Sequence, residues 1–183
     1  MKSSFTRSTV AAAGFTALIS VGAYISIPIG PVPIVLQNFF ILLAGLLLPA
    51  SAALSSVAVY LLLGGLGLPV FAGGTGGIGH FFGPTGGYLL SYLPAVLIIS
   101  LIAGGTTRST LRELAALICG TICIFLTGTL WLRGITGMEW KAALSLGVLP
   151  FLPGDILKIA AALLASRHFS ARVREFFTHE EQR

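Results

Sequence analysis

The sequence predicts an all-α polytopic membrane protein with six transmembrane helices, and three observations support this fold class. The 183 residues are 55% hydrophobic and 9% charged, with a mean hydropathy of +0.95. Apolar residues form successive runs, and a helix needs about 20 of them to cross a bilayer. Proline, glycine or short basic segments separate the runs. We therefore expect one six-helix membrane domain over residues 1–170 and a short charged cytoplasmic tail over residues 171–183.

The expected helices follow from these runs in chain order. Six spans are expected at residues 8–27, 34–48, 52–66, 89–103, 114–132 and 156–166, and a short helix at residues 142–148 precedes the last span. A basic segment before the first run is also typical of a signal peptide. However, this run is long, lacks a small-residue cleavage site and is followed by further spans, so we interpret it as a transmembrane helix.

Basic residues are distributed asymmetrically between the two sides of this arrangement. One side carries Lys2, Arg7, Arg108, Arg112, Arg167, Arg172 and Arg174, and the other side carries Arg133 and Lys141. The positive-inside rule then predicts that both termini lie in the cytoplasm. We expect a multi-pass protein of the plasma membrane. The net charge of +5 lies at helix ends rather than on one face. Membrane lipid is therefore the expected surrounding, and nucleic acid is not an expected partner.

The segment at residues 149–158, LPFLPGDILK, holds an acid and a base three residues apart in a chain with little charge. Asp155 is expected near a helix N-terminus, where free N–H groups and the helix dipole favour a carboxylate. Lys158 lies one turn further along the same helix face. A helix cap with an internal ion pair explains this arrangement. A functional pair also explains it, because a charge within the membrane costs about 3 kcal/mol or more and tends to serve a function.

The glycine-rich segment at residues 64–88 is expected to form an outer loop. It contains the pattern G-x-G-x-x-G, but no strand precedes this pattern, which argues against a dinucleotide site. Glycines such as Gly74 let the backbone approach a ligand, and Phe71 and Tyr88 supply apolar walls. Irregular backbone at membrane depth is either buried in protein or lines a cavity. A ligand site within this loop is therefore expected.

Two further polar residues lie near these segments. Gln37, in the first turn of the second span, either bonds neighbouring backbone or faces a cavity. His80 is a candidate ligand or proton carrier, although a lone histidine in a loop is more often neither. With both termini inside, Gln37, the loop at 64–88 and the segment at 149–158 all fall at outer helix ends. We therefore expect a solute-binding site that opens to the outside.

The first helix carries small residues at four-residue intervals, namely Thr9, Ala13 and Ala17. Small residues at this spacing let another transmembrane helix approach closely. Packing within the bundle and docking of a partner protein both explain this stripe.

Residues for metal, nucleotide or covalent chemistry are not apparent in the sequence. Cys119 and Cys123 lie four residues apart in an apolar run without further ligands nearby, so we expect reduced thiols packed in the core. The sequence contains no Walker A pattern and no nucleophile with an adjacent base. We expect no catalytic residue, no bound metal and no cofactor, and the chain by itself cannot hydrolyse ATP.

Four motifs resemble the BioY family: PVPIVLQ at residues 31–37, GLPVFAGG at 67–74, FGPTGGY at 82–88 and PFLPGDxxK at 150–158. BioY proteins are the biotin-binding S components of energy-coupling factor transporters. The resemblance extends from about residue 8 to residue 170 and implies six helices with biotin bound near the outer surface. It also implies a transmembrane coupling subunit and a pair of ATP-binding cassette ATPases as partners. In this family the last motif contacts the ligand, which implies that role for Asp155 and Lys158, and Thr75 is a further candidate contact.

The chemistry of biotin is consistent with these residues. Its ureido ring has two N–H donors and one carbonyl, so Asp155 is able to accept a ureido N–H while Lys158 donates to the carbonyl. Such charge-assisted bonds are roughly twice as strong as neutral ones. Two other classes of protein are also consistent with the sequence. One is an intramembrane enzyme in which the pair acts as acid and base, and the other is a structural subunit in which the pair only joins helices.

Overall fold

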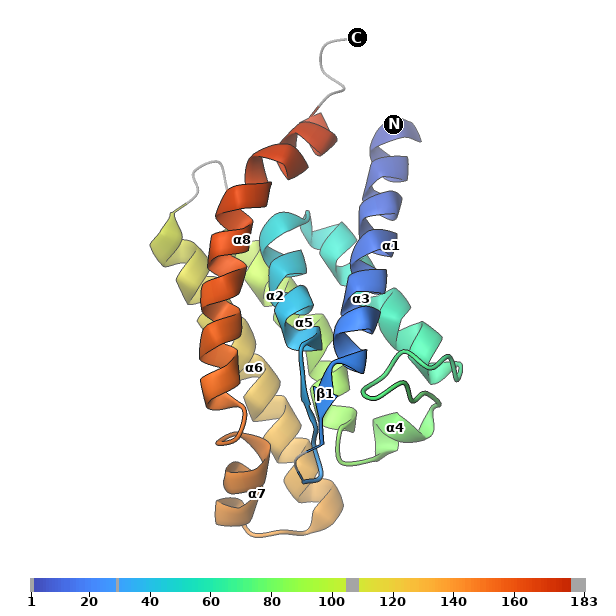
Figure 1. Ribbon diagram of the computed structural model, residues 1–183, viewed down its shortest axis with the longest axis vertical. Coiled ribbons are helices and arrows are strands. Elements are labelled where there is room, and N and C mark those ends of the chain that lie inside the picture. The colour runs from blue at the N-terminus through green and yellow to red at the C-terminus, as the bar shows by residue number, and fades with distance from the viewer. Residues whose placement is uncertain (1, 29, 105–108, 179–183) are drawn as a thin grey trace.

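The computed structural model describes residues 2–28, 30–104 and 109–178, and the expected all-helical class is confirmed (Figure 1). The described residues form eight helices and one two-stranded sheet. In chain order these are α1 (Lys2–Tyr24), β1 (Ser26–Ile27), β2 (Ile34–Val35), α2 (Gln37–Leu47), α3 (Ala50–Gly65), α4 (Gly79–Phe82), α5 (Gly86–Ala103), α6 (Thr110–Thr136), α7 (Trp140–Gly147) and α8 (Leu152–Thr178).

The centre of the molecule is formed by α2 and α5. Figure 1 shows α6, α7 and α8 on one side of these two helices and α1 and α3 on the other. Their shared core is apolar, with Ile41, Val57 and Val96 fully buried. The outward face of α6 is apolar as well, since Ile122, Leu126 and Leu130 are at least half exposed. An apolar surface of this kind is typical of contact with lipid.

The number of membrane-spanning helices is only partly settled by length and composition. Among the described residues, α5 and α6 are long and apolar enough to cross a membrane, and α7 with α8 forms a third candidate that is bent by 44°. The helices α2 and α3 are apolar but have 11 and 16 residues. At 1.5 Å per residue α2 is about 16 Å long, roughly half of the hydrocarbon core. Six spans therefore stay a prediction.

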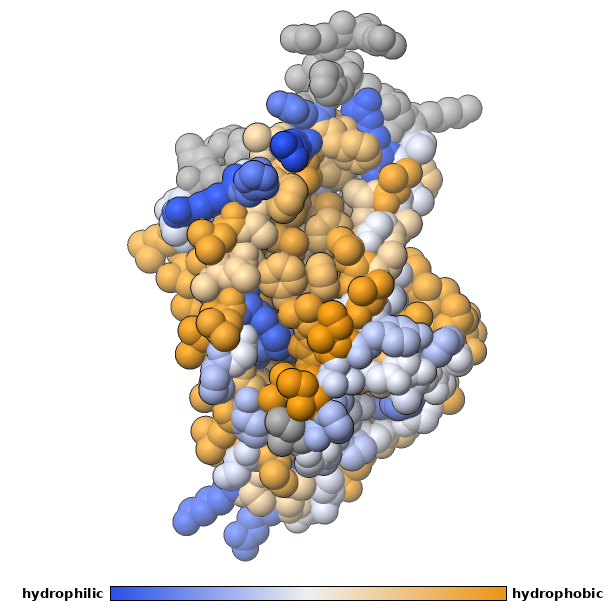
Figure 2. All heavy atoms as spheres, viewed as in Figure 1, coloured by the Kyte–Doolittle hydropathy of each residue, from blue (hydrophilic) through white to orange (hydrophobic). Residues whose placement is uncertain are grey.

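Charged residues gather at the two ends of the molecule. The first turns of α1 and the end of α8 lie at one end (Figure 1), together with the start of α6. Arg7, Arg112 and Arg167 belong to this end, whereas Arg133 and Lys141 lie at the opposite end. Figure 2 shows hydrophilic side chains at both ends of the viewed face and, between them, a mostly hydrophobic region interrupted by one strongly hydrophilic patch.

Several boundaries differ from the sequence prediction. The turn at residues 28–33 joins two short strands, which pair antiparallel with Ser26 opposite Val35. The glycine-rich segment contains the single helical turn α4, and α5 begins at Gly86 rather than Leu89. These strands and this turn are too short to have a sequence periodicity of their own.

The last helix is longer in both directions than predicted. It begins at Leu152 and includes Pro153 and Gly154. Proline is tolerated there, because N–H groups in the first turn lack intrahelical partners in any case. The helix continues to Thr178, so residues 171–178 of the expected tail are helical, and residues 179–183 lie outside the described residues.

The prediction for the two cysteines is wrong in part. Both thiols are free, as expected, but Cys119 is exposed on α6 and Cys123 is only half-buried. An apolar thiol is tolerated on a surface that faces lipid. A cysteine in an apolar segment therefore does not have to lie in the protein core.

Candidate functional site

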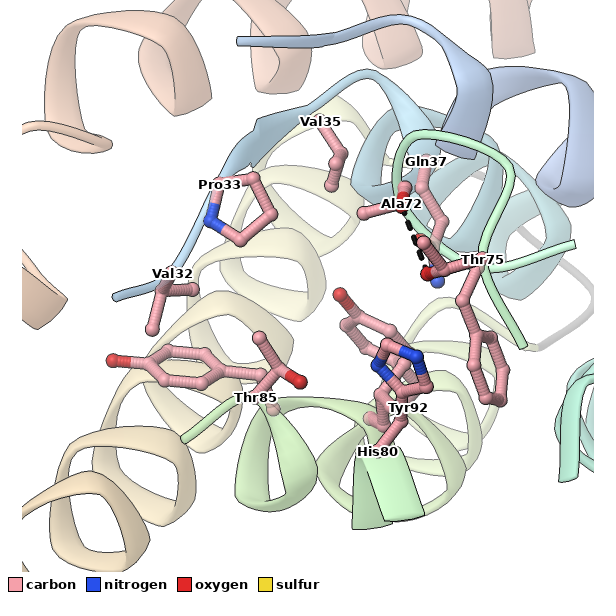
Figure 3. A pocket seen from close by; sticks show the side chains of 12 residues that line it. Val32, Pro33, Val35, Gln37, Ala72, Thr75, His80, Thr85 and Tyr92 are labelled. Carbon is pink, nitrogen blue, oxygen red and sulfur yellow. Dashed lines mark hydrogen bonds between the residues drawn. The ribbon is translucent and has the colours of Figure 1, made fainter. Parts of the chain in front are cut away.

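A cavity of about 200 Å³ lies between the β2 segment, the glycine-rich loop, α4 and α5 (Figure 3). Four of the predicted site residues line it, namely Gln37, Phe71, Thr75 and Tyr88. They come from three separate parts of the chain, and the fold brings them to one place. Apolar side chains make up much of the remaining wall, including Val32, Val35 and Leu89.

Phe71 is the centre of the aromatic wall of this cavity. Its ring meets Tyr60, His80 and Phe81 edge to face, at centroid distances of 5.5, 5.5 and 5.8 Å. The ring is 2% exposed and packs directly on Gly64, where an added Cβ would lie 2.1 Å from a ring carbon. Only glycine at position 64 leaves room for this ring.

The loop holds Phe71 through a tight backbone turn. The Phe71 N–H donates to the Thr75 carbonyl at 2.8 Å, and the Gly74 N–H donates to the Phe71 carbonyl at 2.9 Å. Gly73 and Gly74 have φ of +68° and +75°, which side-chain-bearing residues rarely adopt. Gly74 faces Tyr24 and is not part of the cavity wall. In the structure Gly74 therefore shapes the turn.

The polar groups of the wall are only partly satisfied. Gln37 is 2% exposed, and its Nε2 has no hydrogen-bond partner within the described part of the chain. The Tyr60 hydroxyl lies near Gln37 and is also without a partner there. The Thr75 hydroxyl donates to the Ala72 carbonyl at 3.0 Å, as Figure 3 shows. A ligand group that accepts from Gln37 would remove the cost of leaving this donor unpaired.

Tyr88 connects the cavity to the end of α7 and to the turn that precedes α8. Its hydroxyl donates to the Gly147 carbonyl at 2.8 Å, and its ring lies 6.4 Å from the ring of Phe151. The ring packs so closely on α6 that a Cβ at Gly128 would come within 2.3 Å of it. Tyr88 is therefore a wall residue held in one position by its neighbours.

Sequence reasoning missed Tyr92, which lines the cavity one helical turn after Tyr88. The signal was present, because residues four apart share one face of a helix. It also missed Val32, Val35 and Thr85. No periodicity marks these three, since they belong to turns and strand ends.

Asp155 and Lys158 form the predicted ion pair, with 2.8 Å between Nζ and Oδ1. Asp155 is 4% exposed and lies in the first turn of α8, as expected. Neither residue is in the cavity wall described above. Asp155 is, however, close enough to Tyr92 for its charge to act on the Tyr92 hydroxyl. The ion pair is therefore within electrostatic reach of the cavity wall at Tyr92.

The small-residue stripe of α1 points away from the bundle. Thr9, Ala13 and Ala17 are exposed, whereas the neighbouring Ala12 and Thr16 are buried. Thr9 and Ala13 line an open groove of about 630 Å³ between α1 and α3, with Ser51 and Ser55 on its far side. Packing against this chain's own helices therefore does not account for the stripe.

Known proteins resemble this chain over most of its length. The sequence model of the BioY family matches residues 1–175. A probable biotin transporter BioY of Pyrococcus horikoshii is 47% identical over 150 residues, which is 82% of this chain and 88% of that protein. A biotin transporter BioY of Thermotoga maritima is 41% identical over 162 residues, covering 88% and 95%.

A solved structure has the same fold. The crystal structure of the S-component for biotin from an ECF-type ABC transporter superposes with a TM-score of 0.83 at 32% identity and covers 90% of each chain. Together with the match over residues 1–175, this shows that the chain belongs to the BioY family.

Proposed function

We propose that this chain is the biotin-binding S component of an energy-coupling factor transporter, a membrane protein that takes up biotin rather than an enzyme. The observation that carries the proposal is the cavity, which combines apolar walls with the buried Gln37, whose Nε2 has no hydrogen-bond partner in the described residues, and with Tyr92, on which the charge of Asp155 acts. Relatives at 47% and 41% identity are named as biotin transporters.

The ureido ring is proposed to lie toward Tyr92, next to the ion pair. The Asp155–Lys158 contact uses the carboxylate Oδ1 and one ammonium hydrogen. A carboxylate has a second oxygen and an ammonium group has three hydrogens, so both residues retain capacity for a ligand. Asp155 then accepts a ureido N–H, and Lys158 donates to the ureido carbonyl. Val32, Val35 and Phe71 enclose the apolar middle of the ligand.

Titration of the purified, detergent-solubilised chain with biotin tests this proposal. We expect saturable binding at one site per chain, with biotin recovered unchanged. Recovery of a chemically altered ligand would indicate an intramembrane enzyme. A folded protein that gives no binding signal would leave the Asp155–Lys158 pair with a structural role only.

The cavity is proposed to open to the outside of the cell, with both termini in the cytoplasm. The concentration of Arg7, Arg112 and Arg167 at the opposite end of the molecule supports this orientation. Thr75 is exposed, so a cysteine replacing Thr75, with Cys119 and Cys123 changed to serine, provides a reporter. A membrane-impermeant maleimide should label it in intact cells. Labelling only after permeabilisation would reverse the orientation.

The groove between α1 and α3 is proposed to receive the transmembrane coupling subunit, through which a pair of ATP-binding cassette ATPases energises uptake. Close helix packing in lipid favours small residues such as Ala13 and Ala17. We expect Ala13→Trp to retain biotin binding by the isolated chain but to lose co-purification with the coupling subunit. Leu126→Trp is the control, because Leu126 is 60% exposed on α6. Equal loss of partner binding in both variants would show that the groove is not the specific binding site of the coupling subunit.

A further inference from the structure

We propose that the end of α8 and the start of α1 together bind the headgroup phosphate of an anionic phospholipid. The surface, called here the arginine–phenylalanine surface, consists of Phe169, Arg172 and Phe176 on α8 and Arg7 on α1. The inference goes beyond the proposed function, because it involves neither the cavity nor biotin. It also holds whichever side of the membrane this end of the molecule faces.

The last turns of α8 have one face on the bundle and another face uncovered. Ser166 is fully buried, and Phe177 packs against the apolar core, so the helix contacts the protein up to its end. Phe169, Arg172 and Phe176 follow one another at intervals of three and four residues, which places them on one common face. The two phenylalanines are 43% and 41% exposed, and Arg172 is exposed as well. Two aromatic rings and a cation therefore share this uncovered face.

Arg7 of α1 brings a second cation to the same surface. Its guanidinium carbon Cζ lies 5.9 Å from the centroid of the Phe176 ring, which is within the range of a cation–π contact. Its Nη1 has no hydrogen-bond partner in the described residues. Arginine has five N–H donors. The ring therefore holds this guanidinium in place while its hydrogen-bonding capacity is not used up by the protein.

Two other arginines at this end of the molecule are engaged within the chain. Arg112 donates to the carbonyls of Ile102 and Gly104 and so covers the end of α5. Arg167 donates to the Thr110 hydroxyl and joins α8 to the start of α6. Their position is thus explained by contacts between protein groups, and they are not needed for the proposed surface.

The charges of Arg7 and Arg172 are not neutralised by the protein in this way. Glu175 is exposed three residues after Arg172, but no ion pair joins it to either arginine among the residues that the structure describes. Figure 2 shows strongly hydrophilic residues at the end of the molecule where α1 begins and α8 ends. Guanidinium groups form charge-assisted, often bidentate hydrogen bonds with phosphate. A phosphate from outside the chain therefore matches the two free cations.

The depth of the surface indicates a phospholipid rather than a soluble anion. The 27 residues of α8 span about 40 Å, whereas the hydrocarbon core of a bilayer is about 30 Å thick. Because α8 begins at the opposite end of the molecule, its last turns reach the headgroup region (Figure 1). Aromatic rings there contact the acyl chains, and arginine side chains extend to the phosphates. A phospholipid supplies both groups, and a free phosphate supplies only one.

Native mass spectrometry of the full chain in detergent tests the inference. Dioctanoyl phosphatidylglycerol is the anionic probe, and dioctanoyl phosphatidylcholine is the zwitterionic one. We expect the unmodified chain to bind the anionic lipid at least about fivefold more tightly, the ratio that corresponds to one basic residue at an anionic surface. Equal binding of the two lipids would overturn the inference. Displacement of phosphatidylglycerol by an equal concentration of inorganic phosphate would also overturn it, because the site would then select a free anion.

A charge series at position 172 locates the site. Arg172→Gln should weaken phosphatidylglycerol binding about fivefold, Arg172→Glu should weaken it further, and Arg172→Lys should retain most of it. Any packing of the arginine is lost in all three variants, so the differences between them report charge. Arg133→Gln is the matched control, because it removes one arginine from the opposite end of the molecule. Equal weakening by Arg133→Gln and Arg172→Gln would show only a general attraction to positive charge and overturn the inference.

Arg7→Gln tests whether both helices contribute. It should weaken phosphatidylglycerol binding about as much as Arg172→Gln, and it should leave phosphatidylcholine binding unchanged. An acidic surface of a partner protein is the alternative occupant. If Arg172→Gln kept its phosphatidylglycerol but lost co-purification with the coupling subunit, the arginine–phenylalanine surface would bind that protein, and the inference would be wrong.

Discussion

The two polar regions at this site differ in how their groups are satisfied. Asp155 and Lys158 lie in one turn of α8 and neutralise each other at 2.8 Å. In the cavity wall, by contrast, the Gln37 Nε2 is buried without a hydrogen-bond partner in the described part of the chain. The charges of the first region are neutralised without a ligand, whereas the buried donor of the second region is not paired.

This difference separates stability from binding. Removing one member of a buried ion pair leaves an uncompensated buried charge, so a single substitution there destabilises the free protein. A buried donor without a partner has the opposite effect, because it costs about 1–3 kcal/mol until a ligand satisfies it. A ligand that binds only the folded state then stabilises it by mass action. Variants in the two regions should therefore change stability in opposite directions.

The largest effect is expected for Asp155→Asn. It leaves the Lys158 ammonium without its partner, so we expect the free energy of unfolding to fall by about 3–5 kcal/mol. Biotin affinity should fall at least tenfold, because a charge-assisted acceptor worth about 1.5–3 kcal/mol is lost. Lys158→Met should have similar effects. Thermal unfolding and titration with biotin measure the two quantities.

The double variant Asp155→Asn/Lys158→Met is the control for this prediction. It removes both charges, so stability should recover in part while biotin binding stays weak. Normal affinity in either single variant, together with an early unfolding transition, would assign the pair to structure alone.

An intermediate effect is expected for Gly128→Ala, which disturbs both regions through Tyr88. The new methyl group would lie 2.3 Å from the Tyr88 ring, whose hydroxyl joins α5 to Gly147. We expect the free energy of unfolding to fall by about 1–3 kcal/mol, and biotin affinity to fall with it.

Gly134→Ala in the same helix is the matched control. Nothing lies within 4 Å of a Cβ at that position, and alanine is the better helix former, so stability should be unchanged or slightly raised. If the two alanine variants unfold at the same temperature, the position of Tyr88 is not constrained as the structure indicates.

The smallest effect is expected for Gln37→Met, which should raise stability and lower biotin affinity. Replacing the buried Gln37 amide, whose Nε2 has no partner in the described residues, by an apolar side chain of similar length should raise the free energy of unfolding by about 1 kcal/mol. It should also weaken biotin binding several-fold. Asn38→Leu is the control, because the Asn38 Oδ1 is likewise buried without a partner in the described residues but does not belong to the cavity wall. That variant should gain stability and keep its affinity, and a loss of affinity in it would contradict the comparison.

Much of the site was predictable because its residues are unusual for their surroundings. A carboxylate and an ammonium one turn apart in an apolar chain predict a pair, and Asp155 and Lys158 form it. Phe71, Tyr88 and Gln37 were predicted from an apolar, glycine-rich loop and a lone polar residue, and all three line the cavity. Tyr92 lies four residues after Tyr88 and therefore on the same helix face. No unusual residue adjoins it in the sequence, so it was not predicted.

The sequence by itself determined the helical class, the lipid-facing composition and the chemistry of these few polar residues, since each depends on residue type and local spacing. Only the tertiary structure decided that Gly74 shapes a turn while Gln37 and His80, from separate parts of the chain, line one cavity. It also decided that the Thr9–Ala17 stripe points outward. Which face a helix buries, and which loops meet, depends on packing between segments far apart in the chain, and close contacts such as Phe71 on Gly64 set that packing.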